Sequence, residues 1–347
     1  MSEIISTLIS FGIQAPSGEN CQPWGFKIKE NKLEIWNIPE SDQSLYNFEQ
    51  KGSLVAHGAL IENIIIAGRS LGQALNYTLF PDTGQPNFVV DFRLTPATPS
   101  PEKLFTFIEK RATNRRAYDQ APLLPEECGA LEAAGQGQVV VKTDRASVEK
   151  LASVVSLNER LIFENKLLHN FFFSHIRWTA EEEARNSTGF YLKTLELSPQ
   201  EAKGFNILRH WPVVSVLSKL GLGKKVAAEN SKKYLCAGAF AIVTAPTNSA
   251  RDLVEAGRVA ERMWLTATQL GLSVQPMTGL LFLWQKILAG KVAELSPRHQ
   301  EMIREAVSNI RNQFGLTDSS DTIVMLFRLG HGEPPSARSG RLAPRFL

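Results

Sequence analysis

Cysteine is scarce in this chain of 347 residues, and no Cys-x-x-Cys pair is present. The three cysteines are Cys21, Cys128 and Cys236. Their wide separation and odd number disfavour a disulfide framework and favour free thiols, as in the reducing environment of the cytoplasm. The six histidines also lack the His-x-x-x-His and Cys/His spacings of metal sites. The sequence therefore predicts no metal centre.

Signatures of nucleotide binding are missing as well. The chain has neither a Gly-x-Gly-x-x-Gly turn nor a Walker loop. Such glycine-rich loops bring backbone amides close to phosphates in dinucleotide-binding and NTPase folds. Their absence disfavours these two fold classes.

Charge and hydrophobic runs are both modest. The net charge is +3, and the Lys and Arg residues are spread along the chain without a polybasic tail, so a nucleic-acid partner is not expected. No basic region precedes the apolar N-terminus, and polar residues such as His57, Glu62 and Arg69 interrupt the apolar stretch 54–75. We therefore expect no secretory signal, no membrane span and no membrane partner.

A short internal repeat organises the chain. Four residues of the segment 57–72 recur at one constant separation in the segment 256–271. They are Gly58, Glu62, Leu71 and Gly72 in the first copy and Gly257, Glu261, Leu270 and Gly271 in the second. Both copies read as helices, and each ends in Leu-Gly, a typical left-handed helix stop. The repeat predicts a duplicated fold.

Strand patterns surround the two helices. Residues 26–28 and 33–35 alternate around a turn and predict a β-hairpin, and 88–94, 139–141, 239–243 and 322–329 read as further strands. This mixture predicts an α+β protein with a mainly antiparallel sheet flanked by helices. The Pro-rich stretch within 95–108 is the best linker, which divides the chain into an N-terminal half, 1–100, and a C-terminal half, 101–347.

The region 160–232 is less regular and rich in apolar and aromatic residues. One interpretation is a helical insertion that packs on the core. The other is a lid over a ligand site, because long insertions in compact domains are often functional.

The loop 15–24 carries the clearest signal for a ligand. Ser17, Asn20 and Gln22 offer hydroxyl and amide groups to the polar edge of a flat heterocycle. Pro16 and Pro23 limit the backbone freedom that binding would cost. We therefore expect this loop to bind a ring.

A second cluster of polar residues lies at 110–116. If this segment is extended, Arg111, Thr113 and Arg115 project to one side and present two guanidinium groups and a hydroxyl to one anion. Alone, the run also fits a solvated basic patch. Next to a ring-binding loop, it predicts a phosphate site.

These motifs together resemble the FMN-dependent nitroreductase family, and in particular its single-chain, double-length branch. The loop residues Pro16, Ser17, Gly18, Asn20 and Gln22 resemble that family's ring-edge loop. Arg111, Thr113 and Arg115 resemble its Arg-x-Ser-x-Arg phosphate element. Two further parts resemble its Pro-x-x-Gly turn against the flavin and its basic C-terminal element; they comprise Gln275, Pro276, Met277, Thr278 and Gly279, and then Arg338 and Arg341.

The resemblance implies a nitroreductase-like fold in which the two fused halves form an intramolecular pseudo-dimer with one FMN site. The loop comes from the first half and the other parts from the second. It implies an oxidoreductase that passes a hydride from NAD(P)H through FMN to a small organic acceptor such as a nitroaromatic or a quinone, with no catalytic side chain. The alternative is a non-catalytic protein that sequesters FMN or occludes its own pocket. The chain is expected to be a monomer or a homodimer.

Overall fold

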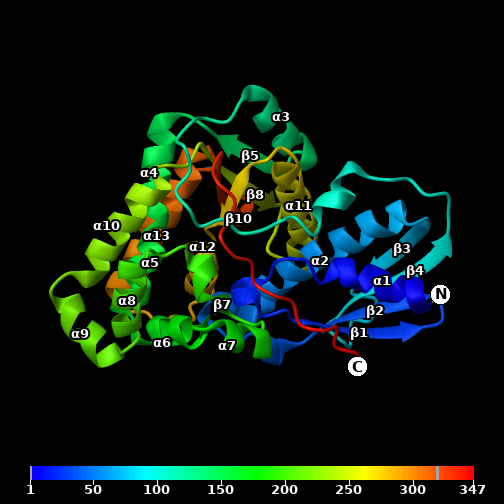
Figure 1. Ribbon diagram of the computed structural model, residues 1–347, viewed down its shortest axis with the longest axis horizontal. Coiled ribbons are helices and arrows are strands. Elements are labelled where there is room, and N and C mark those ends of the chain that lie inside the picture. Colours follow the sequence, from blue (N-terminus) through cyan, green and yellow to red (C-terminus); the bar gives the residue numbers. More distant parts are fainter. Residues whose placement is uncertain (1, 318–319) are drawn as a thin grey trace.

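The computed structural model describes residues 2–317 and 320–347. It contains two four-stranded sheets, and a pair of long helices, α2 (Lys51–Ser70) and α11 (Ala250–Gln269), lies between them (Figure 1). All neighbouring strands in both sheets are antiparallel. The predicted α+β class with antiparallel sheets and flanking helices is confirmed.

The first sheet uses only strands from the N-terminal part of the chain. Its order is β1-β2-β4-β3. The predicted hairpin is formed by β1 (Trp24–Lys29) and β2 (Lys32–Asn37), in which Phe26 pairs with Ile35. The other strands are β4 (Phe88–Pro96), which was predicted, and β3 (Gln73–Leu79), which was not. Buried residues of this sheet pack on α2 and on α1 (Ser2–Gly12).

The second sheet has the order β5-β8-β10-β9 and apolar residues on both faces. Its strands are β5 (Val139–Lys142), β8 (Ala239–Ala245), β10 (Thr322–Gly330) and β9 (Ser273–Pro276). In β8, Ala241 and Val243 belong to the core shared with α2 and α11, whereas Phe240 and Ile242 face a second core. This alternation explains why the strand reads as a continuous apolar run.

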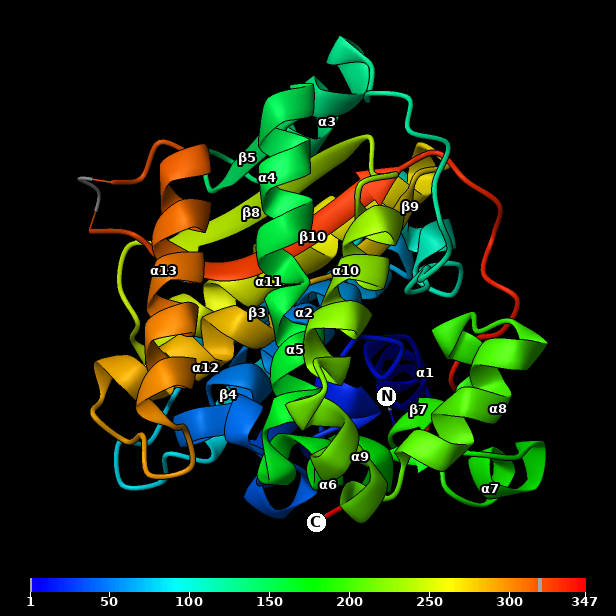
Figure 2. The same ribbon diagram turned by 90° about the vertical axis from the view of Figure 1, so that its left-hand side faces the viewer.

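Helices from the middle and end of the chain cover the outer face of the second sheet (Figure 2). The second core is formed with α4 (Arg145–Val155), α5 (Leu157–Glu164), α12 (Gly279–Leu288) and α13 (Pro297–Gln313). The short α3 (Pro125–Ala134) packs beside β5. No helix in the described ranges is long and apolar enough to cross a bilayer.

The segment 160–232 is mainly helical. After α5 it continues as α6 (Lys166–Ser174), α7 (Ala180–Arg185), α8 (Pro199–Leu208), α9 (Trp211–Lys219) and α10 (Leu222–Tyr234). Two short parallel strands, β6 (Ile176–Arg177) and β7 (Phe190–Tyr191), lie between these helices. A third, separate apolar cluster holds this segment together around Phe163, Phe173 and Val214.

The central helices cross at the two glycines of the sequence repeat. A Cβ atom on Gly58 would lie 2.0 Å from the carbonyl oxygen of Val254, and one on Gly257 would lie 2.1 Å from that of Val55. The contacts are reciprocal: each glycine meets the residue three positions before the other. Reciprocal contacts of this kind are the mark of a twofold-like interface. Only hydrogen side chains allow the backbones to approach so closely.

Two segments of the sequence analysis take a more specific form in the structure. Gln275 and Pro276 belong to β9 and Gly279 begins α12, so the expected Pro-x-x-Gly turn is the connection from this strand to this helix, with Met277 and Thr278 between them. The proposed linker is not a free connection. The strand β4 extends to Pro96, and the 3₁₀ helix Lys103–Phe107 places Leu104 in the core. Burial of apolar side chains therefore overrides the proline signal.

We expect Gly257→Ala to destabilise the protein by about 3 kcal/mol or more, because the added methyl group would force α2 and α11 apart. The matched control is Gly129→Ala in α3, where a Cβ atom would meet nothing within 4 Å. That change should leave stability equal or raise it by up to about 1 kcal/mol. Chemical denaturation measures both, and equal stabilities of the two variants would contradict the close crossing.

Candidate functional site

One cavity of about 150 Å³ is lined by four segments that are far apart in the sequence. They are residues 14–20, at the start of the ring-edge loop, the segment 109–115, residues 189–194 of the helical insertion and the C-terminal residues 337–341. The ring-edge loop and the Arg-x-Thr-x-Arg segment therefore face the same space. Of the predicted residues, the cavity is lined by Pro16, Ser17, Asn20, Arg111, Thr113, Arg115, Arg338 and Arg341.

The first loop is held in an unusual backbone shape. Glu19, Asn20 and Gln22 all have positive φ angles, of 43°, 54° and 50°. The amide nitrogen of Gln22 donates to Ser17 Oγ at 3.0 Å, which closes the turn. Such left-handed conformations in non-glycine residues are costly and are concentrated at functional sites. The local chain is thus shaped around Ser17 and Asn20.

The amides of this loop bind the helical insertion. Asn20 Nδ2 and Gln22 Nε2 both donate to the carbonyl oxygen of Ser187, the latter at 3.2 Å. The side-chain oxygen of Gln22 accepts from the amide nitrogen of Leu342 at 2.9 Å, and Gln22 itself does not line the cavity. In addition, Gly189 N donates to Glu19 O at 2.6 Å. The loop therefore anchors the insertion and the C-terminal segment.

Arg111 is the most buried of the four arginines. Its Nε lies 3.2 Å from Glu261 Oε1, and its guanidinium stacks over the Trp264 ring at 4.6 Å. Its Nη2 donates to the carbonyl oxygen of Gln14 at 2.7 Å. Because α11 supplies both Glu261 and Trp264, this helix fixes Arg111 in the wall of the cavity.

The other three arginines bind mainly carbonyl oxygens. Arg341 donates to the carbonyls of Ile13 at 2.9 Å and Gln14 at 3.0 Å. Arg115 donates to the carbonyl of Thr194 at 3.1 Å and lies over the Phe190 ring at 5.3 Å. Arg338 donates to the carbonyls of Glu109 and Arg111, each at 2.6 Å. The contacts of these three arginines orient the guanidinium groups but leave their positive charges uncompensated.

The cavity therefore carries an excess of positive charge. In the described part of the chain, Glu261 is the one carboxylate that forms an ion pair with these four arginines. Burial lowers the pKa of Arg341, and the charge of Arg111 lowers it further. Burial followed by the charge of Arg111 also lowers the pKa of Arg338. A bound anion would relieve this mutual repulsion.

The repeat has a counterpart of this cluster without the charge excess. Glu62, which matches Glu261, lies 3.1 Å from Arg258 and 2.5 Å from Arg262. A second carboxylate, Glu102, lies 3.1 Å from Arg262 and 2.8 Å from Arg69. Here carboxylates and guanidiniums neutralise one another. The two equivalent places have thus diverged, and one of them remains cationic.

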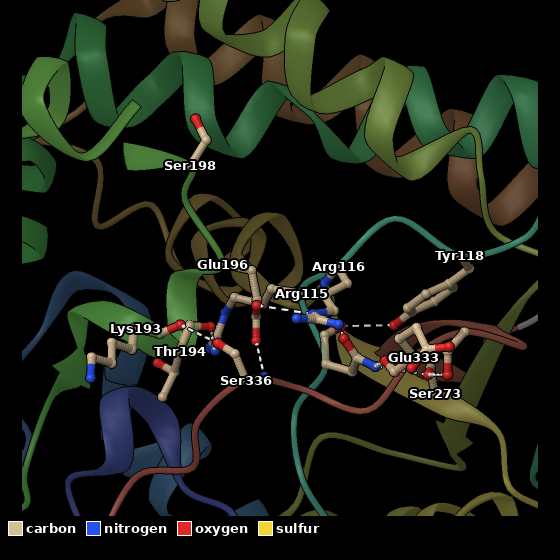
Figure 3. Close-up of polar contacts among 12 residues, drawn as sticks. Arg115, Arg116, Tyr118, Lys193, Thr194, Glu196, Ser198, Ser273, Glu333 and Ser336 are labelled. Atoms are coloured by element: carbon tan, nitrogen blue, oxygen red, sulfur yellow. Dashed lines mark hydrogen bonds and ion pairs between the residues drawn. The ribbon is translucent and has the colours of Figure 1, made fainter. Parts of the chain in front are cut away.

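Side-chain contacts fix the segment that carries Arg115 (Figure 3). Asn114 Nδ2 donates to Ser273 Oγ and to the carbonyl of Glu333, both at 2.8 Å, and Tyr118 OH donates to the Asn114 carbonyl at 2.8 Å. The next residue, Arg116, has its Nε 3.1 Å from Glu196 Oε2. Neighbouring side chains thus face opposite sides: Arg115 lines the first cavity, and Arg116 lines a second one of about 500 Å³.

The segment 275–279 does not line the cavity, contrary to the expectation. The side-chain oxygen of Gln275 accepts from Arg328 Nε at 2.7 Å, and Met277 belongs to the second core. The reason is the fully buried Arg328, which needs an acceptor inside the protein. Thr278 and Gly279 lie where α12 begins, and Gly279 faces Asn158. Pro276 pairs with Phe327 in the sheet, and Gly18 lies beside Asp42.

Several lining residues could not be found from the sequence. Gln14 and Glu109 flank the predicted motifs, but Gly189, Phe190 and Thr194 belong to the insertion, far from any motif. The one signal they carry is membership of the long apolar region 160–232. Its docking on the first loop decides which of its residues reach the cavity.

Comparisons with known proteins find distant relatives, one of which has a name that includes nitroreductase. No family model matches the chain. An uncharacterised protein of Mycobacterium tuberculosis is 27% identical over 98% of this chain and 47% of its own length. A protein of the same organism, named as a candidate NAD(P)H nitroreductase, is 23% identical over 45% of this chain and 46% of its own length. The chain spans about half the length of the curated relatives it matches.

Solved structures give weak similarity of the same kind. A Bacteroides fragilis nitroreductase with bound FMN is 12% identical, with 70% of this chain and 95% of that chain covered and a TM-score of 0.35. The FMN-dependent nitroreductase NfnB of Mycobacterium smegmatis, in complex with NADPH, is 16% identical, with coverages of 68% and 92% and a TM-score of 0.35. Both of these solved structures are nitroreductases.

We expect inorganic phosphate to raise the midpoint of thermal unfolding more than sodium chloride of equal ionic strength, because an anion that binds only the folded state stabilises it. Arg338→Gln should weaken this effect. Arg304→Gln is the control, since Arg304 is exposed and pairs with Glu301 on α13. Equal midpoints in phosphate and chloride would contradict an anion site.

Proposed function

We propose that this chain is an FMN-dependent oxidoreductase whose cavity binds the phosphate group of FMN. The observation that carries the proposal is the set of four arginines, of which only Arg111 has a carboxylate ion-pair partner in the described part of the chain. An anion with several oxygens suits such a set, because each charge-assisted hydrogen bond adds about 1.5–3 kcal/mol. A phosphate monoester satisfies this requirement.

The residues divide into two groups in this proposal. Arg111, Arg115 and the hydroxyl of Thr113 hold the phosphate, with Arg338 and Arg341 closing the site from the C-terminal segment. Ser17 and Asn20, which line the same cavity, face the flavin. Bound FMN supplies the transfer of a hydride from NAD(P)H to a small organic acceptor, such as a nitroaromatic or a quinone. The chain binds and orients the cofactor and adds positive charge beside it.

The proposal also includes an intramolecular pseudo-dimer. The loop 14–20 comes from the N-terminal part, and the arginines come from the C-terminal part. The reciprocal contacts of Gly58 and Gly257 support this arrangement, because they relate the two helices as a twofold axis relates subunits. One chain then holds one complete site, as a monomer or within a homodimer. The free cysteines favour the cytoplasm as its compartment.

A second candidate function rests on the size of the cavity. Its volume of about 150 Å³ is below the ~300–1,000 Å³ of ordinary ligand pockets. The amides of Asn20 and Gln22 are occupied by the Ser187 carbonyl. The insertion therefore covers the place proposed for the flavin rings. In this alternative the protein is non-catalytic and either sequesters FMN or occludes its own pocket.

We expect the chain to bind FMN and to bind riboflavin, which lacks the phosphate, at least about 100-fold more weakly. Arg115→Ala should weaken FMN binding about 10- to 150-fold, the equivalent of one charge-assisted hydrogen bond. The control is Lys110→Ala, because Lys110 lies over Phe107 outside the cavity. Fluorescence titration measures these affinities. Equal affinity for the two flavins would remove the phosphate from the proposal.

Anaerobic addition of NADPH or NADH to the FMN complex then separates the two functions. An oxidoreductase loses the absorbance of oxidised flavin near 450 nm within the time of mixing and regains it with an acceptor. A protein that only stores FMN keeps its colour.

We expect Phe190→Ala to speed FMN association several-fold, because this ring lies in the cavity wall under Arg115. Tyr191→Ala is the matched control, since its ring does not line the cavity. Stopped-flow quenching of flavin fluorescence measures the rate. Unchanged association in both variants would show that the insertion does not restrict entry.

A further inference from the structure

The helical insertion ends in a protruding tip. We use "tip" for residues 203–225, which comprise the second half of α8, all of α9 and the start of α10. In Figure 1, α9 and the start of α10 lie at the left-hand margin of the molecule, the side that faces the viewer in Figure 2. It is distant in the sequence from every segment that lines the first cavity except 189–194.

The outer face of the tip is apolar and uncovered. Leu220 is 80% exposed, Val216 59%, Ile207 58% and Val213 38%. The residues 213, 216 and 220 follow one another at helical spacing, so they form one continuous stripe along α9.

The inner face of α9 shows that this exposure is not a sign of poor packing. Val214 is fully buried in the third apolar cluster, and Ser218 Oγ donates to the Phe163 carbonyl. The helix is therefore firmly attached on one side and presents a second apolar stripe to the outside. Large exposed apolar groups in one place indicate an interaction site.

The tip is also rich in positive charge. The tip contains no Asp or Glu, and none occurs from residue 202 to residue 228. Its cations all lie on the exposed surface, and the ion pairs of the described residues include none of them; they are Lys203, Arg209, Lys219, Lys224 and Lys225. The segment 203–225 thus carries five cations and no acidic residue, a local excess of positive charge within a chain whose overall net charge is only +3.

We propose that the tip docks peripherally on an anionic lipid membrane surface. An exposed apolar stripe on a segment whose cations form no ion pair among the described residues matches the boundary between acyl chains and acidic headgroups, where such side chains insert shallowly. A second copy of the tip is disfavoured, because five cations would face five cations. A lipid surface also needs no shape complementarity from this convex end.

The test is co-sedimentation of the full chain with vesicles. We expect binding to phosphatidylcholine vesicles that contain about 30% phosphatidylglycerol, much weaker binding to pure phosphatidylcholine, and release in 0.5 M NaCl, which screens surface charge. The charge-reversal variant is K224E/K225E. It should weaken binding at least about 25-fold, because each lysine contributes about fivefold. These residues lie in the first turn of α10, where glutamate favours a helix.

A control variant and a second test variant accompany this experiment. The K103E/K150E variant makes the same change in net charge at exposed lysines elsewhere and should leave vesicle binding within about threefold of wild type. Leu220→Ser removes the most exposed apolar side chain and should weaken binding without altering the circular dichroism spectrum.

Three outcomes would overturn the proposal: no binding to the acidic vesicles, equal losses in K224E/K225E and K103E/K150E, or self-association that depends on Leu220 without vesicle binding. The third outcome would assign the tip to an interface between copies of the chain. If the first outcome were found and the tip bound an acidic protein, that protein would replace the membrane as the proposed partner.

Discussion

The rest of the structure depends on the close crossing of α2 and α11 at Gly58 and Gly257. At this contact the Cα atom of each glycine packs against the backbone of the other helix, around the carbonyl oxygens of Val254 and Val55. The inner faces of both helices are buried between the two sheets. It also places Glu261 and Trp264 where they hold Arg111. A side chain at either glycine would therefore disturb the core and the cationic cavity together.

The cavity illustrates how a duplicated fold becomes asymmetric. Glu62 and Glu261 occupy equivalent positions in the repeat. The arginines that pair with Glu62 also pair with Glu102 and Glu255, whereas only one of the four cavity arginines has a carboxylate partner among the described residues. Only the second arrangement leaves charge available for a ligand. The insertion adds a further difference, because its Ser187 carbonyl occupies the amides of the first loop. Binding of a flavin ring would have to compete with these internal contacts.

Sequence reasoning succeeded where short-range patterns decide. Alternating apolar residues identified β1, β2 and β4, and a continuous apolar run identified β8. The Leu-Gly endings marked the stops of α2 and α11, with Gly72 and Gly271 at positive φ. It missed β3, because the residues of this strand are mostly exposed or half-buried and show little contrast between apolar and polar positions. It also did not foresee the position of Gln275, because this side chain accepts a hydrogen bond from Arg328, which lies on a strand some fifty residues away. A hydrogen bond between a buried charged side chain and a residue far away in the chain produces no recognisable pattern in the local sequence.

The sequence alone determined the fold class, the repeated helix and the residue types that face the cavity, because periodicity and side-chain chemistry are local properties. The tertiary structure decided which of these residues meet. It brought Ser17 and Arg111 to the same cavity, moved Gln275 into the interior and left the apolar side chains of the tip exposed. The physical reason is that the net charge of a cavity and the exposure of a side chain depend on which residues lie close in space. The order of residues along the chain does not specify those spatial neighbours.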